Sequence, residues 1–411
     1  MFFTNDKNYC VRRFISRAIR PLKIFIADSR AVGILLICCT IISLLITNLM
    51  GGWYENFWNY NFHFFSSLHL PHSVLKWIND FLMAFFFLLA GMEIKKELVT
   101  GELSSFKKAV LPFGAALGGM LVPAIIFLTF NVQSGFAHGW GIPTATDIAF
   151  SLGVASLFSK RVPPSLKIFL MALAIIDDLG AIVVIALFYG GQIKWLYLLI
   201  AALIYGIIWS SLHLKKMSPG ILHICLSLLL WFVILNSGIE ASITGVLIAF
   251  AMPVNSLSKI ENAIHKEVNF IILPLFALAN TAILIPADIA GSLQSSISIG
   301  VIAGLVLGKP IGIFLVSKIL VGLKIAHLPN LTNWKQFLGM GALAGIGFTM
   351  SIFTTTLAFQ DEINRNTAKI AIIASLVLSV TISWIYFMAI EPKTLVRKQI
   401  KFNTALVPEL G

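Results

Sequence analysis

Long apolar runs recur along this chain from about residue 31 to about residue 390, with short polar segments between them. Each run approaches the roughly 20 residues that an α-helix needs to cross the hydrocarbon core of a bilayer. The pattern predicts an all-α polytopic membrane protein with twelve transmembrane helices. We place these helices near residues 31–49, 75–98, 109–131, 140–159, 166–190, 195–213, 219–236, 238–253, 267–285, 297–320, 336–358 and 368–390.

Basic residues are concentrated in alternate loops between these runs. Among the intervening loops, one holds Lys194 alone, and Arg365 and Lys369 are offset by Asp361 and Glu362. The loops that contain no lysine or arginine are 51–74, 132–139, 236–240 and 284–297. Because cytoplasmic loops carry an excess of lysine and arginine, the alternation supports the twelve spans and predicts that both termini are cytoplasmic. It divides the chain into a basic cytoplasmic tail (1–30), a transmembrane domain (31–392) and a second cytoplasmic tail (393–411).

The composition agrees with a membrane protein. Of 411 residues, 58% are hydrophobic and only 12% are charged, and the mean hydropathy is +0.91. A net charge of +12 can indicate nucleic-acid binding, but here the bases are not gathered in one soluble domain, so no nucleic-acid partner is expected. The cysteines, at positions 10, 38, 39 and 225, have neither paired nor metal-ligand spacing, which predicts no disulfide framework and no zinc site.

Loop 51–74 contains one short stretch with a different pattern. Apolar and polar residues alternate from Trp58 to Phe64, which is the period of a half-buried strand. This predicts a strand or a small β-hairpin at the outer interface, and the edge of such a hairpin could pair two protomers. The same residues also fit an aromatic belt at the membrane surface, and the pattern leaves both interpretations open.

Three carboxylates lie within the apolar runs: Asp147, Asp177 and Asp178. An aspartate at the centre of a bilayer costs about 2.5–3.5 kcal/mol, so ionisable residues there indicate a functional site, and a transported cation is the plain candidate. Adjacent residues of a helix project about 100° apart. One of Asp177 and Asp178 can therefore meet a cationic side chain while the other faces the path of the ion.

One basic residue, Lys309, lies deep in an apolar run. A buried lysine without a partner would lose its proton, so we expect it to pair with one of the aspartates. Such a pair could serve only helix packing or could take part in function, and the sequence leaves both open for Lys309. For the aspartates a purely structural role is disfavoured, because one lysine cannot neutralise three carboxylates.

Two of the predicted helices, the fourth and the eleventh, are interrupted. The interruptions are Pro143–Thr146 and Gly345–Thr349. Each broken helix is the middle one of a group of three, 109–190 and 297–390. This arrangement predicts a transporter with inverted three-helix repeats and a binding site near the membrane midplane.

The first break adds candidate ligands to the aspartates. Unwound backbone frees carbonyl oxygens, and Thr146 adds a hydroxyl. Asp147 could bind a hard cation, offset the positive ends of the two half-helices, or simply cap a helix; ion binding or charge compensation is favoured. The three aspartates and Lys309 sum to minus two when all are ionised. Such a set binds protons at low pH and a small cation at higher pH, which with alternating access yields cation/proton exchange.

The other acids lie near the ends of the predicted helices. Glu93 and Glu97 stand four residues apart at the inner end of one helix, and Glu261 lies in a polar inner loop; on spacing alone these are ordinary charged termini. Asp80 is expected at the outer interface. Glu240 precedes a helix start, where an acid is favoured.

Six segments carry motifs of one known family: Trp77–Asp80, Gly91–Leu98, Thr144–Phe150, Ala174–Gly180, Leu307–Gly312 and Leu343–Phe353. Together they resemble the NhaA family of bacterial sodium/proton antiporters, over about residues 31–390. That family is itself one of the known examples of transporters with inverted repeats and paired interrupted helices.

The resemblance implies an electrogenic exchanger of Na⁺ or Li⁺ for H⁺ in the bacterial inner membrane, with two crossing interrupted helices and a hairpin that joins homodimers. It implies that Asp178, with Asp177, carries the ion and the protons. It also implies that Asp177 pairs with Lys309 and that Thr146 and Asp147 line the site. Positions tied to the pH response are matched by Glu93, Glu97 and Glu261. No cofactor is expected beyond the transported ions.

Two positions depart from the family pattern. Glu240 stands where members commonly have a histidine, and Asn262 stands where a histidine would follow Glu261. A carboxylate does not change charge near neutral pH unless its surroundings perturb it. These departures bear on the pH profile of activation and not on the transport chemistry.

Three other classes of membrane protein are alternatives to an antiporter. An intramembrane aspartyl protease is disfavoured because Gly345–Gly347 is followed by phenylalanine rather than aspartate. An ATP-driven pump is disfavoured because Gly304–Pro310 is one residue short of a phosphate loop and lacks its Ser or Thr. A sodium- or proton-coupled symporter of a small solute remains the alternative, because hydropathy and buried acids do not distinguish symport from antiport.

Overall fold

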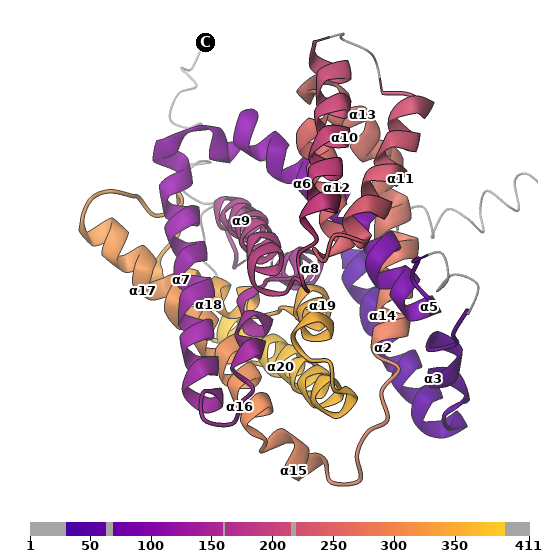
Figure 1. Cartoon of the computed structure of the whole chain (residues 1–411). Coiled ribbons are helices and arrows are strands. Elements are labelled where there is room, and N and C mark those ends of the chain that lie inside the picture. Colours follow the sequence, from indigo (N-terminus) through magenta and orange to yellow (C-terminus); the bar gives the residue numbers. More distant parts are fainter. Residues whose placement is uncertain (1–29, 63–68, 159–160, 215–218, 391–411) are drawn as a thin grey trace, which may run out of the picture.

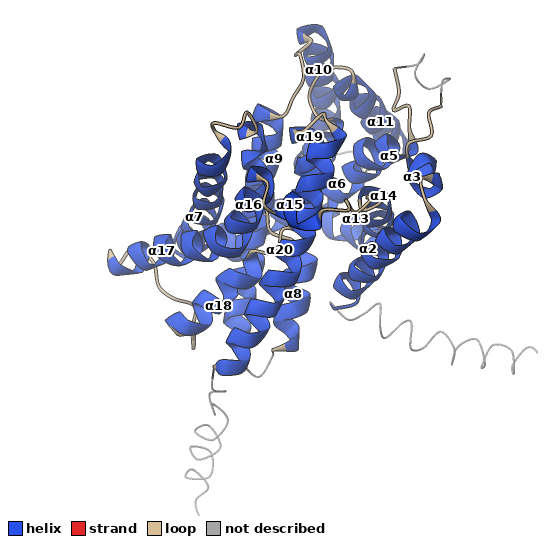
Figure 2. Ribbon diagram, turned by 90° about the horizontal axis from the view of Figure 1, so that it is seen from below, coloured by secondary structure: helices blue, strands red, loops and turns tan. Residues whose placement is uncertain are grey.

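The computed structural model describes residues 30–62, 69–158, 161–214 and 219–390. Within these ranges the chain forms helices and the turns between them, with no strand (Figure 2). The prediction of an all-helical fold is confirmed. The predicted tails, 1–30 and 393–411, lie outside the described residues apart from Arg30.

Seven helices in the described part are long and apolar enough to cross a membrane, or eight if one bent pair counts as a single span. They are α2 (Arg30–Met50), the continuous α5 (Val74–Lys76), η1 (Trp77–Leu82) and α6 (Met83–Val99), α7 (Phe106–Asn131), α9 (Pro164–Phe188), α10 (Trp195–His213), the continuous α16 (Ser296–Ala303), η6 (Gly304–Gly308) and α17 (Lys309–Gly322), α20 (Glu362–Ala389), and the bent pair α18 (Trp334–Ala344) and α19 (Phe348–Ala358).

Shorter helices occupy the other four predicted spans. They are η3 (Ala137–Thr144) with α8 (Ile148–Leu157), α11 (Ile221–Leu235), η4 (Ala241–Ile243) with α12 (Thr244–Ala251), and η5 (Val268–Ile272) with α14 (Leu273–Asn280). Three further short helices lie between spans: α3 (Trp53–Trp58), η2 (Glu102–Ser104) and α15 (Ile289–Leu293). Helix length and hydropathy alone therefore support fewer spans than the predicted twelve.

The predicted strand does not form over the described part of Trp58–Phe64. Helix α3 ends at Trp58, and the only pairing nearby in the described residues is one isolated antiparallel bridge between Asn61 and Ser73. Residues 63–68 lie outside the described part, so the hairpin is not confirmed. Tyr54 and Trp58 are buried on one face of α3, with ring centroids 5.6 Å apart. Helix α3 lies before the alternating stretch and shares only Trp58 with it.

The segment around Glu261, predicted as a polar loop, is helical instead. Helix α13 (Val254–Glu267) continues directly into η5 and α14. Leu257 is buried, and Ile260 and Ile264 pack against the same apolar cluster, which includes residues of α6. These positions form a helical stripe of spacing three and four, whereas the rest of α13 is polar, so that mean hydropathy does not reveal the helix.

The interrupted segments lie in the middle of the molecule. Figure 1 shows α8, α9, α18 and α19 between α7 and α17 on one side and α6, α12, α14 and α2 on the other. Helices α7 and α17 approach closely at Gly118 and Gly312, where a Cβ on either glycine would collide with the carbonyl of the other. Small residues at such crossings let two backbones pack tightly within a membrane. This packing positions Lys309, near the start of α17, against the centre of the fold.

Candidate ion-binding site

The two interrupted segments are joined by hydrogen bonds at their breaks. The amide of Asp147 donates to the carbonyl of Ile346 over 2.6 Å, and the hydroxyl of Ser151 donates to the carbonyl of Leu343 over 2.9 Å. Helices α18 and α19 meet at an angle of 45° across their break. Irregular backbone at membrane depth needs partners of this kind, because no water is present to satisfy it.

Asp147 joins the starts of two helices. Its Oδ1 atom accepts a hydrogen bond from the amide of Phe150 (3.0 Å) in the first turn of α8. Its Oδ2 atom accepts from both the amide (3.1 Å) and the hydroxyl (2.7 Å) of Thr349, in the first turn of α19. The partial positive charges of both helix N-termini therefore face one buried carboxylate. Asp147 therefore both caps α8 and offsets the positive helix ends, two of the roles that the sequence left open.

Lys309 and Asp177 form an ion pair that is fully buried. The Nζ and Oδ2 atoms lie 2.6 Å apart, and both side chains have 0% exposure. The Lys309 ammonium also donates to the hydroxyl of Thr146, and that hydroxyl lies 2.6 Å from Asp177 Oδ2. Lys309 follows the π-helical turn η6 and precedes Pro310. The ammonium is thus held by two groups from different elements.

Asp178 lies next to this pair but faces a different environment. Its side chain is 4% exposed, and its Oδ1 atom is buried without a hydrogen-bond partner among the described residues. It lines a cavity of about 390 Å³ together with Thr146, Asp147 and Thr349, which we call the inner cavity. Carboxylate and hydroxyl oxygens are the ligands that hard cations such as Na⁺ prefer.

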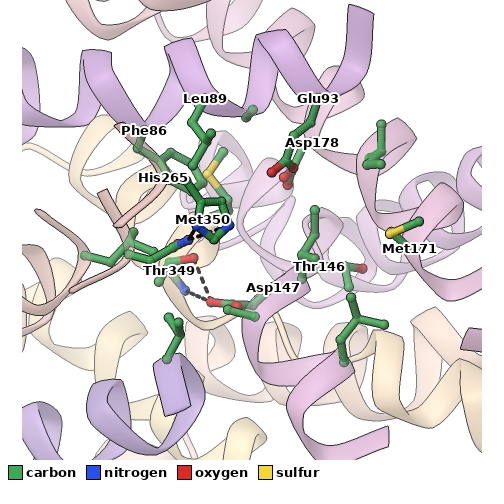
Figure 3. Close-up of a pocket in the computed structure, with 18 of the residues that line it drawn as sticks. Phe86, Leu89, Glu93, Thr146, Asp147, Met171, Asp178, His265, Thr349 and Met350 are labelled. Carbon is green, nitrogen blue, oxygen red and sulfur yellow. Dashed lines mark hydrogen bonds between the residues drawn. The ribbon is translucent and has the colours of Figure 1, made fainter. Parts of the chain in front are cut away.

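Charged residues line the rest of the inner cavity. They are Glu93, Lys96, Glu97, Glu261 and His265. Figure 3 shows Glu93 reaching from α6 toward Asp178, with which it interacts electrostatically. Lys96 and Glu261 form an ion pair of 3.1 Å between α6 and α13, and Glu97 accepts a hydrogen bond from the amide of Glu102 (2.9 Å). A polar path therefore connects these groups with the aspartates.

A second cavity, of about 640 Å³, lies farther along two helices that also line the inner cavity, the α5–η1–α6 helix and α19; we call it the outer cavity. Asp80 lines it from the first of these helices and Phe353 from the second, and most of its other lining residues are polar. Asp80 and Glu93 are separated by about 20 Å along a helix that rises 1.5 Å per residue. Between the cavities, Phe87 and Phe353 are buried with ring centroids 5.5 Å apart. These two rings form an apolar barrier.

The structure also shows residues that the sequence did not single out. Thr349 was noted only as part of a break, and its two hydrogen bonds to Asp147 were not foreseen. Lys96 was regarded as one of several terminal charges, and its pairing with Glu261 bridges 165 residues of sequence. The hydroxyl of Thr349, at the end of a Gly-rich interruption, could have suggested this residue as a ligand. Nothing in the sequence indicated the partner of Lys96.

One family model matches this chain, and three related proteins are similar to it. The family model described as Na⁺/H⁺ antiporter 1 matches residues 23–387. The Na⁺/H⁺ antiporter NhaA 2 of Flavobacterium johnsoniae is 47% identical over 366 residues, covering 86% of this chain and 89% of that protein. The NhaA proteins of Dechloromonas aromatica (46% identical, 85% of this chain, 90% of that protein) and Escherichia coli (42%, 88% and 96%) are similar at comparable length.

Proposed function

The chain belongs to the Na⁺/H⁺ antiporter 1 (NhaA) family, and from that premise we propose how its buried carboxylates exchange the two ions. It is a multi-pass membrane protein that exchanges Na⁺ for H⁺. We infer that it works in the bacterial inner membrane, that its tails 1–30 and 393–411 are cytoplasmic, and that Li⁺ can replace Na⁺. It needs no cofactor on this account.

One observation carries the mechanism: Asp178 is buried, lacks a partner at Oδ1 and faces the inner cavity. A buried carboxylate without a neutralising partner is unfavourable. Asp178 therefore takes up either a proton or a Na⁺ ion, and each excludes the other from the same oxygens. Thr146 and Asp147, on the same cavity wall, supply further oxygen atoms toward the ion.

The Lys309–Asp177 pair gives the exchange its electrogenic character in this proposal. A Na⁺ ion that binds between Asp177 and Asp178 weakens the attraction that keeps Lys309 charged, so the buried ammonium releases a proton. Asp178 releases another. Because more positive charge leaves the site than enters it, the cycle moves net charge across the membrane.

Alternating access requires the site to open to one side at a time. The inner cavity connects Asp178 with the polar groups around Glu93, whereas Phe87 and Phe353 separate it from the outer cavity. We propose twelve spans with inverted repeats, 109–190 and 297–390, whose crossing breaks move relative to the other helices. Positive loops, and hence the cytoplasm, lie on the side of the inner cavity.

The charged groups of the inner cavity are proposed to set the pH response. The ion pair of Lys96 with Glu261 connects α6 to α13. The exposed fraction is 45% for the Lys96 side chain and 15% for the Glu261 side chain. The link depends on the charges of both side chains, and Glu93 and Glu97 line the same space. A homodimer, joined through the segment between α2 and α5, completes the proposal.

Everted membrane vesicles with a proton-sensitive dye test the exchange. Added Na⁺ should dissipate an acid-inside gradient in vesicles that contain the wild type, and Asp178→Asn should abolish this response. Asp361→Asn, which changes an exposed helix cap that lines neither cavity, is the control. A wild type that responds to Na⁺ only when a co-transported solute is present would favour the symport alternative.

A further inference from the structure

Two serines link the two interrupted segments in the same way, one from each segment. Ser151 lies on α8, and its hydroxyl donates to the carbonyl of Leu343 in the last turn of α18 (2.9 Å). Ser351 lies on α19, and its hydroxyl donates to the carbonyl of Ile142 in the last turn of η3 (2.7 Å). Both serines have 0% exposure. Each segment therefore gives one hydrogen bond to the other and accepts one in return.

The two serines occupy equivalent positions in their segments. Each lies four residues after the residue that precedes its half-helix, which is Asp147 for α8 and Gly347 for α19. The amide of Ser151 donates to the carbonyl of Asp147 (2.9 Å), and the amide of Ser351 donates to the carbonyl of Gly347 (2.7 Å). A Cβ on Gly347 would collide with the Ser351 hydroxyl, so glycine leaves the room that this hydroxyl needs. Each serine thus joins the break of its own segment to the first half of the other segment.

The accepting carbonyls lie where a helix cannot satisfy its own backbone. Carbonyls in the last turn of a helix have no amide partner in a following turn, and the interior of a bilayer supplies no water. A hydroxyl from the crossing segment provides a hydrogen bond at each of these two places. Loss of either hydroxyl would leave its carbonyl with one bond fewer, so the two half-helices that it joins would be less firmly held together.

The two hydroxyl bonds hold half-helices on different sides of the candidate site. Helix α8 contributes Ile148 and Leu152, on either side of its serine, to the wall of the inner cavity. Helix α19 begins at the inner cavity with Thr349 and reaches the outer cavity beyond its serine, at Phe353 and Thr356. The first serine therefore fixes a helix of the inner wall, and the second fixes a helix that forms part of the outer wall.

We propose that Ser151 and Ser351 are positioning residues, each of which sets the affinity for Na⁺ at one face of the protein. The proposal rests on the proposed exchange function and adds two residues to it. Neither serine lines either cavity, so each acts through the half-helices that it joins. Ser151 holds α8 against α18 and keeps Asp147 in place for Na⁺ that arrives through the inner cavity. Ser351 holds α19 against η3, so that the same break presents its oxygen atoms to Na⁺ that arrives from the outer cavity.

Purified protein in proteoliposomes of known orientation tests the two roles. Radioactive Na⁺ uptake gives the half-saturating Na⁺ concentration and the maximal rate separately for each face of the protein. For Ser151→Ala we expect the half-saturating concentration to rise roughly fivefold at the inner face and much less at the outer face, because one hydrogen bond is lost. For Ser351→Ala we expect the same rise at the outer face and little change at the inner face. The maximal rate should change less than the half-saturating concentration in both variants.

Ser375→Ala is the matched control. Ser375 is also 0% exposed, but its hydroxyl donates to the carbonyl of Ala371 within α20 (2.6 Å), and it lines neither cavity. We expect wild-type half-saturation at both faces for this variant. Thermal unfolding of the three variants accompanies the uptake measurements, since a serine with a merely structural role would lower stability without a difference between the two faces.

Equal changes at both faces for the serine variants, no change at either face, or a rise at the opposite face would overturn the two positioning roles. The same face-dependent rise for Ser375→Ala would also overturn them. A wild type that exchanges no ions would instead overturn the proposed function.

Discussion

Asp177 and Asp178 are neighbours in the chain, yet only Asp177 is neutralised by a base. Asp177 accepts a hydrogen bond from Lys309 over 2.6 Å, whereas Asp178 has no ion-pair partner among the described residues and lines the inner cavity. Each of the two carboxylates keeps its Oδ1 atom without a hydrogen-bond partner in the described part of the chain. The helix separates the two side chains by about 100°, so one segment supplies both a fixed charge partner and an ion ligand. The account of exchange depends on this difference.

Replacement of Asp178 by asparagine should abolish exchange without unfolding the protein. The amide keeps the size of the side chain but cannot bind a proton or neutralise Na⁺. Because the change removes a buried charge, thermal stability should stay equal or rise. Dye-monitored exchange and thermal unfolding of the same preparation check both points. Exchange at the wild-type rate would remove Asp178 from the ion path.

Loss of Lys309 should destabilise the fold more than loss of the whole pair. Lys309→Met leaves Asp177 buried and uncompensated, which costs about 3–5 kcal/mol. The double variant Lys309→Met with Asp177→Asn removes both charges and should recover most of that loss. Unfolding in detergent measures the free energies of the two single variants and of the double variant. If the effects of the single changes simply add in the double variant, the pair is not energetically coupled.

Thr349→Val should weaken the link between the two interrupted helices. The change removes one hydrogen bond to a buried carboxylate, worth about 1.5–3 kcal/mol, but leaves the amide bond of Thr349 to Asp147. Thr354→Val is the matched control, because that hydroxyl donates only to the carbonyl of Met350 in its own helix. Equal losses of stability in both variants would show that the contact with Asp147 adds nothing.

Gly312→Ala should disrupt the crossing of α7 and α17. The new methyl group would overlap the carbonyl of Gly118, so backbone must shift, at a cost of about 1–3 kcal/mol. Gly322, at the end of the same helix, has open space around its Cα, so Gly322→Ala should be neutral or slightly stabilising. Thermal unfolding distinguishes the two variants, and no loss for Gly312→Ala would contradict the tight crossing.

Glu55, on α3 outside the spans, should make stability fall as pH rises. Burial and the neighbouring Glu362 raise the pKa of Glu55 above its ordinary value of 4.5. The folded protein therefore holds this proton more tightly than the unfolded chain, so the stabilising contribution is present at low pH and is lost as pH rises through the raised pKa. Glu55→Gln should lose this dependence, which thermal unfolding at several pH values measures. Identical pH profiles for both proteins would contradict it.

Much of the site could be predicted because membrane burial restricts where charges occur. Asp147, Asp177, Asp178 and Lys309 were found from the sequence because each interrupts an apolar run, and a charge there needs a reason. The two breaks were found because Gly and Pro are conspicuous within spans. That Lys309 pairs with one of the aspartates follows from the same argument, whereas Asp177 as its partner was implied by the resemblance to the NhaA family.

The remaining features depend on long-range packing. Thr349 lies 202 residues from its partner Asp147, and no local pattern indicates such a contact. Helix α13 was missed because its apolar stripe is narrow, and α3 because six residues are too few for a helical period to be recognised.

The most direct test of the central claim is the half-saturating Na⁺ concentration of the wild type measured at the inner face across a range of pH. If Na⁺ and protons compete for Asp178, this concentration rises as pH falls, by about tenfold per pH unit for each proton that Na⁺ displaces, while the rate at saturating Na⁺ is much less affected. A half-saturating concentration that does not change with pH, with a maximal rate that falls instead, would contradict competition at this carboxylate.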